Sequence, residues 1–168
     1  MGASTAVLFR LAGVAAILAG VLRALDAFAF KFLSMHDSEQ LFLVTDIFLL
    51  FGLIGIYSRV ANRVGWGGLA GFAAALVGIL LVRSANGIID AYVVGATIVA
   101  VGVAVMGVGA LAARAFPRPA PILWIAALVA GLLAYYIESD WLFQAAGVSF
   151  GLGFVMAGAE LLRRPGAA

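Results

Sequence analysis

Residues 11–30 read LAGVAAILAGVLRALDAFAF, an apolar run that is interrupted only by Arg23 and Asp26. A run of this length and composition predicts a transmembrane helix, because about 20 apolar residues are enough to cross a bilayer. Ionisable groups inside such a helix are costly unless they pair or face a wet cavity. Arg23 and Asp26 stand three residues apart, so they share a helix face and can neutralise each other. The stretch therefore predicts a membrane helix that contributes to a polar site.

The composition of the whole chain also indicates a membrane protein. Of its 168 residues, 65% are hydrophobic and 11% are charged, and the mean hydropathy is +1.18. Soluble domains contain about 25% charged residues. The absence of cysteine excludes disulfides, thiolate metal sites and cysteine nucleophiles, and His36 is the single histidine. We therefore expect neither a metal site nor a cofactor.

Six apolar segments predict an all-α, polytopic integral membrane protein, folded as a compact bundle of six transmembrane helices in one domain, 1–168. The approximate spans are 6–32, 40–60, 65–86, 90–114, 119–137 and 140–163. Residues 21–26, VLRALD, are echoed by residues 81–86, LVRSAN, at matching places in the first and third spans. Three repeated helical hairpins would explain this echo, but helices rich in Ala, Gly, Leu and Val also resemble each other by chance.

The charges predict how the helices are oriented. If the spans alternate in direction, one end of the protein receives both termini and seven of the ten basic residues, with Glu160 as its one acid. The basic residues of that end are Arg10, Arg59, Arg63, Arg114, Arg118, Arg163 and Arg164. The other end receives three basic and seven acidic residues. Because cytoplasmic loops of membrane proteins are enriched in Arg and Lys, we expect a multi-pass protein of the cell membrane with both termini cytoplasmic.

Small residues follow stripes along several of the predicted helices. Ala12, Ala16 and Gly20 line one face of the first span, and Gly147 and Gly151 form a GxxxG pair in the last. Small residues let helices approach closely in a membrane. We therefore expect these faces to meet other helices, either of this chain or of a partner membrane subunit. The polar groups that end such stripes should point into the protein instead of into lipid.

Polar and aromatic residues near the acidic ends of the spans predict an outward-facing pocket that binds a ligand. The candidate residues are Arg23, Asp26, Asp46, Arg83, Asn86, Asp90, Tyr135, Glu138, Asp140, Trp141 and Gln144. Asp46 lies about 8 Å inside its span, so its carboxylate has to be paired, protonated or wetted. A simpler interpretation remains open for several of the others. The aromatic residues would also suit an interfacial belt, and Arg23 with Asp26 could be a structural ion pair.

The first functional hypothesis is that this pocket binds or transports a small amphipathic or cationic molecule, with Arg23 or Arg83 holding a carboxylate of the ligand. In size, helix number and the placement of both ends, the chain is similar to the substrate-capturing S components of energy-coupling-factor vitamin transporters. That resemblance implies a partner subunit that meets the small-residue face of the first helix, here Ala12 and Ala16.

Two alternatives belong to other classes. The chain could be a structural subunit of a membrane complex with no chemistry of its own, which suits its high Gly and Ala content and short loops. It could also be a membrane enzyme acting on a lipid or isoprenoid, with Asp46, Asp26 and Glu138 as acid–base groups. Gly147-Val-Ser-Phe-Gly151 matches a nucleophile elbow in letters only, because that motif needs a strand before it. We lean towards a protein that is not an enzyme, and nothing in the sequence favours a nucleic-acid partner.

Overall fold

A computed structural model describes residues 3–29, 35–84 and 89–163 of the chain. All of its regular structure is helical, and this part of the chain contains no strand. The helices are α1 (Ala3–Ala29), α2 (Met35–Ser84), α3 (Ile89–Ala112), α4 (Pro119–Ile137) and α5 (Asp140–Arg163). Each of the five contains a stretch that is long and apolar enough to cross a membrane. The prediction of an all-α protein with membrane-length helices is therefore confirmed.

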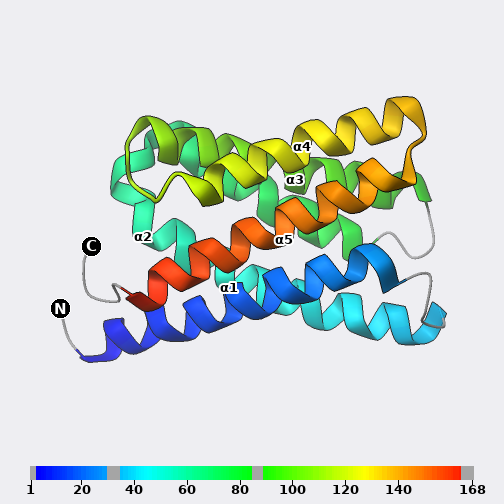
Figure 1. Cartoon of the computed structure of the whole chain (residues 1–168). Coiled ribbons are helices and arrows are strands. Elements are labelled where there is room, and N and C mark those ends of the chain that lie inside the picture. Colours follow the sequence, from blue (N-terminus) through cyan, green and yellow to red (C-terminus); the bar gives the residue numbers. More distant parts are fainter. Residues whose placement is uncertain (1–2, 30–34, 85–88, 164–168) are drawn as a thin grey trace.

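The predicted number of six helices is wrong, since the described residues form five. The predicted spans 40–60 and 65–86 belong to one 50-residue helix, α2, in which Gly65 has non-helical backbone angles (φ 59°, ψ −160°). Asp46 and Arg83 form an ion pair across this helix. In a straight helix, two residues 37 positions apart would be separated by about 55 Å along the axis. The helix therefore reverses direction at Gly65, and Figure 1 shows α2 turning back on itself.

We call residues 35–64 the first arm of α2 and residues 66–84 its second arm. Helix α1 packs against both α5 and α2, α2 packs against α3, and α4 lies against α5 and α3 (Figure 1). The turn at Gly65 has a local cause. A positive φ is strained for residues with a side chain, and glycine adopts it readily. A β-carbon at Gly65 would meet no other atom within 4 Å, so the conformation and not the space requires glycine there.

Two helix pairs are held together by glycines. Gly13 and Gly20 of α1 face Gly158 and Gly151 of α5. The second arm of α2 and α3 use the same arrangement, with Gly71 and Gly78 facing Gly102 and Gly95. In both pairs the two glycines of one helix are seven residues apart, which is close to two helical turns. A β-carbon added at any of these glycines would clash with a backbone carbonyl oxygen of the opposite helix. The backbones of each pair are therefore in close contact, which only glycine allows at these positions.

The small-residue faces proposed for a partner subunit are covered by the chain itself. Ala12 and Ala16 contact the first arm of α2 at Gly55 and Gly52, and Gly20 contacts α5. On α5, Gly147 lies against Ala27 of α1 and Gly151 against Gly20. These stripes therefore hold this chain's own helices together.

The core between the helices is apolar along most of its length. Its largest fully buried side chains include Trp124, Phe154, Leu53, Ile56 and Met106. Asp26 and Thr45 are the buried polar or charged residues among those described; Asp26 lies in the last turn of α1, and Thr45 lies in the first arm of α2. Apart from these two residues, the described core consists mainly of apolar side chains.

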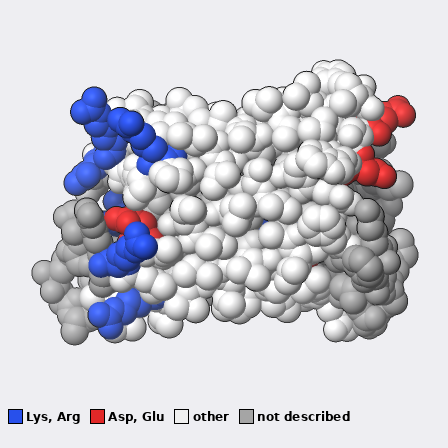
Figure 2. Space-filling view, viewed as in Figure 1, with Lys and Arg blue, Asp and Glu red and all other residues white. Residues whose placement is uncertain are grey.

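The two ends of the protein differ in charge, as the sequence predicts. Both termini lie at the same end (Figure 1). Figure 2 shows the basic side chains gathered at that end and acidic side chains at the other, with one acidic group among the basic ones. We refer to these as the basic end and the acidic end.

Candidate functional site

Four of the predicted site residues come together near the acidic end of the helices. Arg23 and Asp26 are contributed by α1, Asp46 by the first arm of α2, and Arg83 by its second arm. Arg23 Nη1 lies 3.9 Å from Asp26 Oδ2, and Arg83 Nε lies 3.5 Å from Asp46 Oδ2. Arg23 and Asp46 are also close enough to interact electrostatically. We call these four residues the charge cluster, and its formal charge is zero.

Two neutral residues complete the surroundings of the charge cluster. Thr45 lies beside Asp26, but its hydroxyl donates to the carbonyl of Leu41 at 2.9 Å, one turn earlier in the helix. Tyr92 of α3 lies within hydrogen-bonding reach of Arg23. Neither Tyr92 nor Thr45 was among the site residues predicted from the sequence. The signal in the sequence that could have indicated Thr45 is a hydroxyl residue within an apolar segment, directly before Asp46.

The acids of the charge cluster are buried without full hydrogen bonding. The side chain of Asp26 is 1% exposed and that of Asp46 is 18% exposed, while both arginines are about a third exposed. Neither carboxylate oxygen of Asp26 has a hydrogen-bond partner among the described residues, and the same holds for Asp46 Oδ2 and Arg83 Nη1. Charge-assisted hydrogen bonds measure about 2.7–2.9 Å, so both ion pairs are longer than such bonds. The cluster therefore keeps unused capacity to bind polar groups.

No known protein family, curated protein or solved structure matches this chain. Its function has to be argued from the site itself.

Four other predicted site residues lie on the surface at the turn between α4 and α5. Tyr135 and Trp141 are largely exposed, and the ring of Tyr135 makes an edge contact with Tyr136. Glu138 ends α4 in a left-handed conformation (φ 51°), and Asp140 begins α5. Aromatic residues in this position suit the belt at a membrane surface. In the part of the chain that the structure describes, no ion pair includes Glu138 or Asp140.

The remaining predicted residues add little to the charge cluster. Gln144 is half-buried on α5, one turn after Asp140. Asp90 lies in the first turn of α3, and its side chain is outside the described set. Asn86 also lies outside the described residues. Within those residues no group of three or more His, Cys, Asp or Glu side chains is placed to hold a metal ion.

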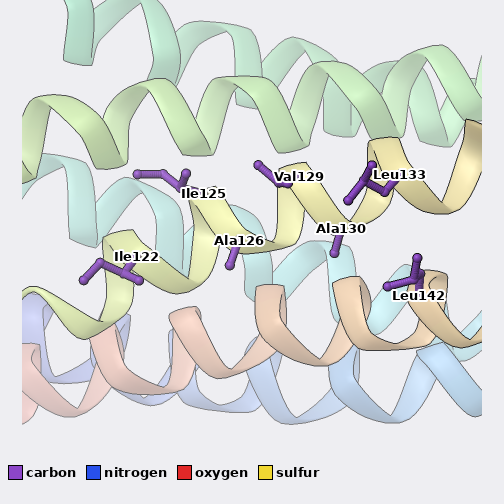
Figure 3. Close-up of a pocket in the computed structure, with 7 residues that line it drawn as sticks. All are labelled: Ile122, Ile125, Ala126, Val129, Ala130, Leu133 and Leu142. Atoms are coloured by element: carbon purple, nitrogen blue, oxygen red, sulfur yellow. The ribbon is translucent and has the colours of Figure 1, made fainter.

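Two hollows in the structure lie away from the charge cluster. One is an apolar groove of 420 Å³ along α4 (Figure 3). It is lined by Ile122, Ile125, Ala126, Val129, Ala130 and Leu133 of α4 and by Leu142 of α5. The other, of 160 Å³, lies at the basic end between the start of α4 and the end of α5. Neither hollow combines the acids and aromatics of the predicted ligand pocket.

Proposed function

We propose that this chain is a multi-pass membrane protein that binds or transports a small cationic or amphipathic molecule at the charge cluster. The observation that carries the proposal is the pair of carboxylates, Asp26 and Asp46, which lie in membrane-length helices. Both oxygens of Asp26 and Oδ2 of Asp46 are buried without a hydrogen-bond partner among the described residues, and their ion pairs are long, at 3.9 and 3.5 Å. Charged side chains inside membrane spans are expensive, and they commonly mark binding sites or ion pathways. A purely lipid-facing helix would have no use for them.

The proposed arrangement in the membrane is a compact bundle with six crossings. The reversal of α2 at Gly65 lets its two arms cross separately, so five helices supply six crossings. The basic end would face the cytoplasm together with both termini, and the charge cluster would open towards the outer surface. This orientation is supported by the segregation of charge between the two ends (Figure 2).

Asp46 is the carboxylate that a ligand would reach first, because it is more exposed than Asp26. An ammonium group at hydrogen-bonding distance would bind Asp46 more closely than Arg83 does at 3.5 Å. Arg83 would then be free to hold a carboxylate or another anionic group of the same ligand. Since the charge cluster is neutral, a zwitterionic ligand can replace an internal ion pair without adding net charge to the protein. A cation alone would leave Arg83 unpaired, so we expect zwitterions to bind better than simple cations.

The charge cluster also favours a second candidate, a structural subunit without ligand chemistry. The Arg83–Asp46 pair joins the two arms of α2, and Arg23 of α1 interacts with Asp46 and with Tyr92 of α3, so the charge cluster can hold these segments together. In that case a substitution in the charge cluster would change the stability of the protein and nothing else. No comparable observation favours the enzyme, since Glu138 lies exposed at the end of α4 and takes no part in the cluster.

The test is thermal unfolding of the purified full chain in detergent with four probes: β-alanine, betaine, choline and spermidine. We expect at least one probe to raise the unfolding temperature and the effect to disappear in Asp46→Asn. Asp140→Asn is the matched control, because Asp140 is an exposed carboxylate at the same end and should leave the effect intact. An equal loss in both variants would contradict the proposal. If no probe shifts the wild type while Asp46→Asn alone changes its unfolding temperature, the structural candidate is the better account.

A further inference from the structure

The apolar groove along α4 has the shape of a channel for a hydrocarbon chain. Its lining from Ile122 to Leu133 runs for about 16 Å along the helix, at 1.5 Å per residue. Ala126 and Ala130 are small and stand between bulkier residues, which leaves the hollow (Figure 3). Its volume of 420 Å³ lies in the range of small-molecule sites. The groove is therefore a defined depression on a surface that is otherwise covered by large apolar side chains.

Basic residues come just before the end of this groove that begins at Ile122. Arg118 precedes Ile122 by four residues, and the amide of Ile122 donates to the carbonyl of Arg118 at 3.2 Å. The two side chains therefore share one face of the helix start. Arg114 lies in the connection between α3 and α4 with a left-handed backbone (φ 49°), and both arginines are exposed. Figure 2 shows the basic side chains at this end of the molecule.

The guanidinium groups, and not the helix backbone, are the groups that can hold an anion here. Pro119 and Pro121 have no amide hydrogen, and the amide of Ile122 is already used, so the first turn of α4 offers few free donors. Arginine binds phosphate through two parallel hydrogen bonds. The acid nearest to this region among the described residues is Glu160, which lines the second hollow on α5 together with Arg163.

We propose that this face binds one anionic phospholipid, with an acyl chain in the groove along α4 and the phosphate at Arg114 and Arg118. The ligand has to be amphipathic and negatively charged at one end, because the groove is apolar along its length and basic at its mouth. A membrane phospholipid satisfies both requirements. A transmembrane helix of a partner would fill the apolar part but would offer no phosphate to the two arginines.

The test is native mass spectrometry of the purified, delipidated full chain, titrated with phosphatidylglycerol and with phosphatidylcholine of the same acyl chains. An arginine near an anionic lipid contributes about fivefold in affinity, so we expect phosphatidylglycerol to bind about 25-fold more tightly. The double variant Arg114→Gln/Arg118→Gln should lose this preference, and its affinity for phosphatidylcholine, whose choline balances the phosphate charge, should fall much less. Ala126→Leu/Ala130→Leu fills the groove and should weaken both lipids.

Two matched controls separate this site from general attraction to the membrane. Arg63→Gln removes an exposed arginine of the same end, and Ala73→Leu enlarges an exposed alanine on the second arm of α2; neither should change lipid binding. Equal losses in the control variants would overturn the proposal. Glycerol phosphate, which has no acyl chains, should not compete with phosphatidylglycerol, and efficient competition would show that the groove is not used. A dimer that disappears in Ala126→Leu/Ala130→Leu would show that a second copy occupies the groove, which would also overturn it.

Discussion

The substitution Gly102→Ala tests whether close backbone contact holds α2 and α3 together. A β-carbon at Gly102 would lie 2.5 Å from the backbone nitrogen of Ala75 and 2.6 Å from the carbonyl oxygen of Gly71. Ordinary contacts of a β-carbon begin at 3.4 Å, so the two helices would have to separate by about 0.9 Å. No side chain can rotate to relieve this clash, because the opposing atoms belong to the backbone. A gap of 0.5–1 Å forfeits about a quarter to a half of the van der Waals attraction across an interface.

The expected result is a net loss of stability. Overpacking costs about 1–3 kcal/mol, while Gly→Ala inside a helix gains about 0.5–1 kcal/mol, so Gly102→Ala should lower the free energy of unfolding by about 1–2 kcal/mol. The measurement is reversible unfolding of the full chain by SDS in mixed micelles, followed by tryptophan fluorescence. Gly67→Ala and Gly131→Ala are controls, since a β-carbon meets nothing within 4 Å at Gly67 and only Ala146 at 3.8 Å at Gly131. If Gly102→Ala unfolds with the same free energy as the controls, backbone contact at this interface does not limit stability, and the packing argument fails.

Three further predictions concern the turn, the charge cluster and the orientation. Gly65→Ala should cost about 1–3 kcal/mol of unfolding free energy, because φ 59° with ψ −160° is a conformation essentially restricted to glycine, and Gly65→Asn should cost a similar amount. A neutral Gly65→Ala would show that α2 does not need this turn. Arg83→Leu should lower the free energy of unfolding by about 2 kcal/mol, because it leaves Asp46 without its ion pair. The double variant Arg83→Leu/Asp46→Leu should recover most of this loss, and a double variant that loses the sum of the two single losses would contradict the pairing. Because the chain has no cysteine, Tyr136→Cys and Arg63→Cys can each be labelled singly. We expect a membrane-impermeant maleimide to label Tyr136→Cys on intact cells and Arg63→Cys only after lysis, and labelling of both on intact cells would refute the orientation.

The features that were predictable from the sequence depend on residues that lie close together along the chain. Membrane-length helices follow from apolar runs, and the pairing of Arg23 with Asp26 follows from their spacing along one helix. The separation of charge between the two ends also requires only the alternation of spans. The course of α2 was not predictable in this way. Residues 61–64 lay between the predicted spans 40–60 and 65–86, but the helix continues through them and reverses at Gly65.

Contacts between distant segments account for the rest of what the sequence did not show. The partner of Asp46 is Arg83, 37 residues away, and that pairing exists only because α2 folds back. The sequence grouped Tyr135, Glu138 and Trp141 with the charge cluster because all lie near the acidic ends of their spans. The structure shows them exposed at the turn between α4 and α5. Position along a helix axis is readable from sequence, whereas position around the axis depends on how neighbouring helices pack.

The interface between α1 and α2 changes character along its length, and this bears on how a ligand would act. Towards the basic end, Ala12 and Ala16 press against Gly55 and Gly52, so the two helices cannot come closer there. Towards the acidic end, the same interface holds Asp26 and Asp46, and both oxygens of Asp26 and Oδ2 of Asp46 lack hydrogen-bond partners among the described residues. A ligand that replaces the ion pair of Asp46 would disturb only the polar half. The apolar half would remain closed, because glycine and alanine contacts do not depend on charge. Because that ion pair joins the two arms of α2, we expect ligand binding to separate these arms at the acidic end, while α1 stays fixed to the first arm by its contacts at the basic end.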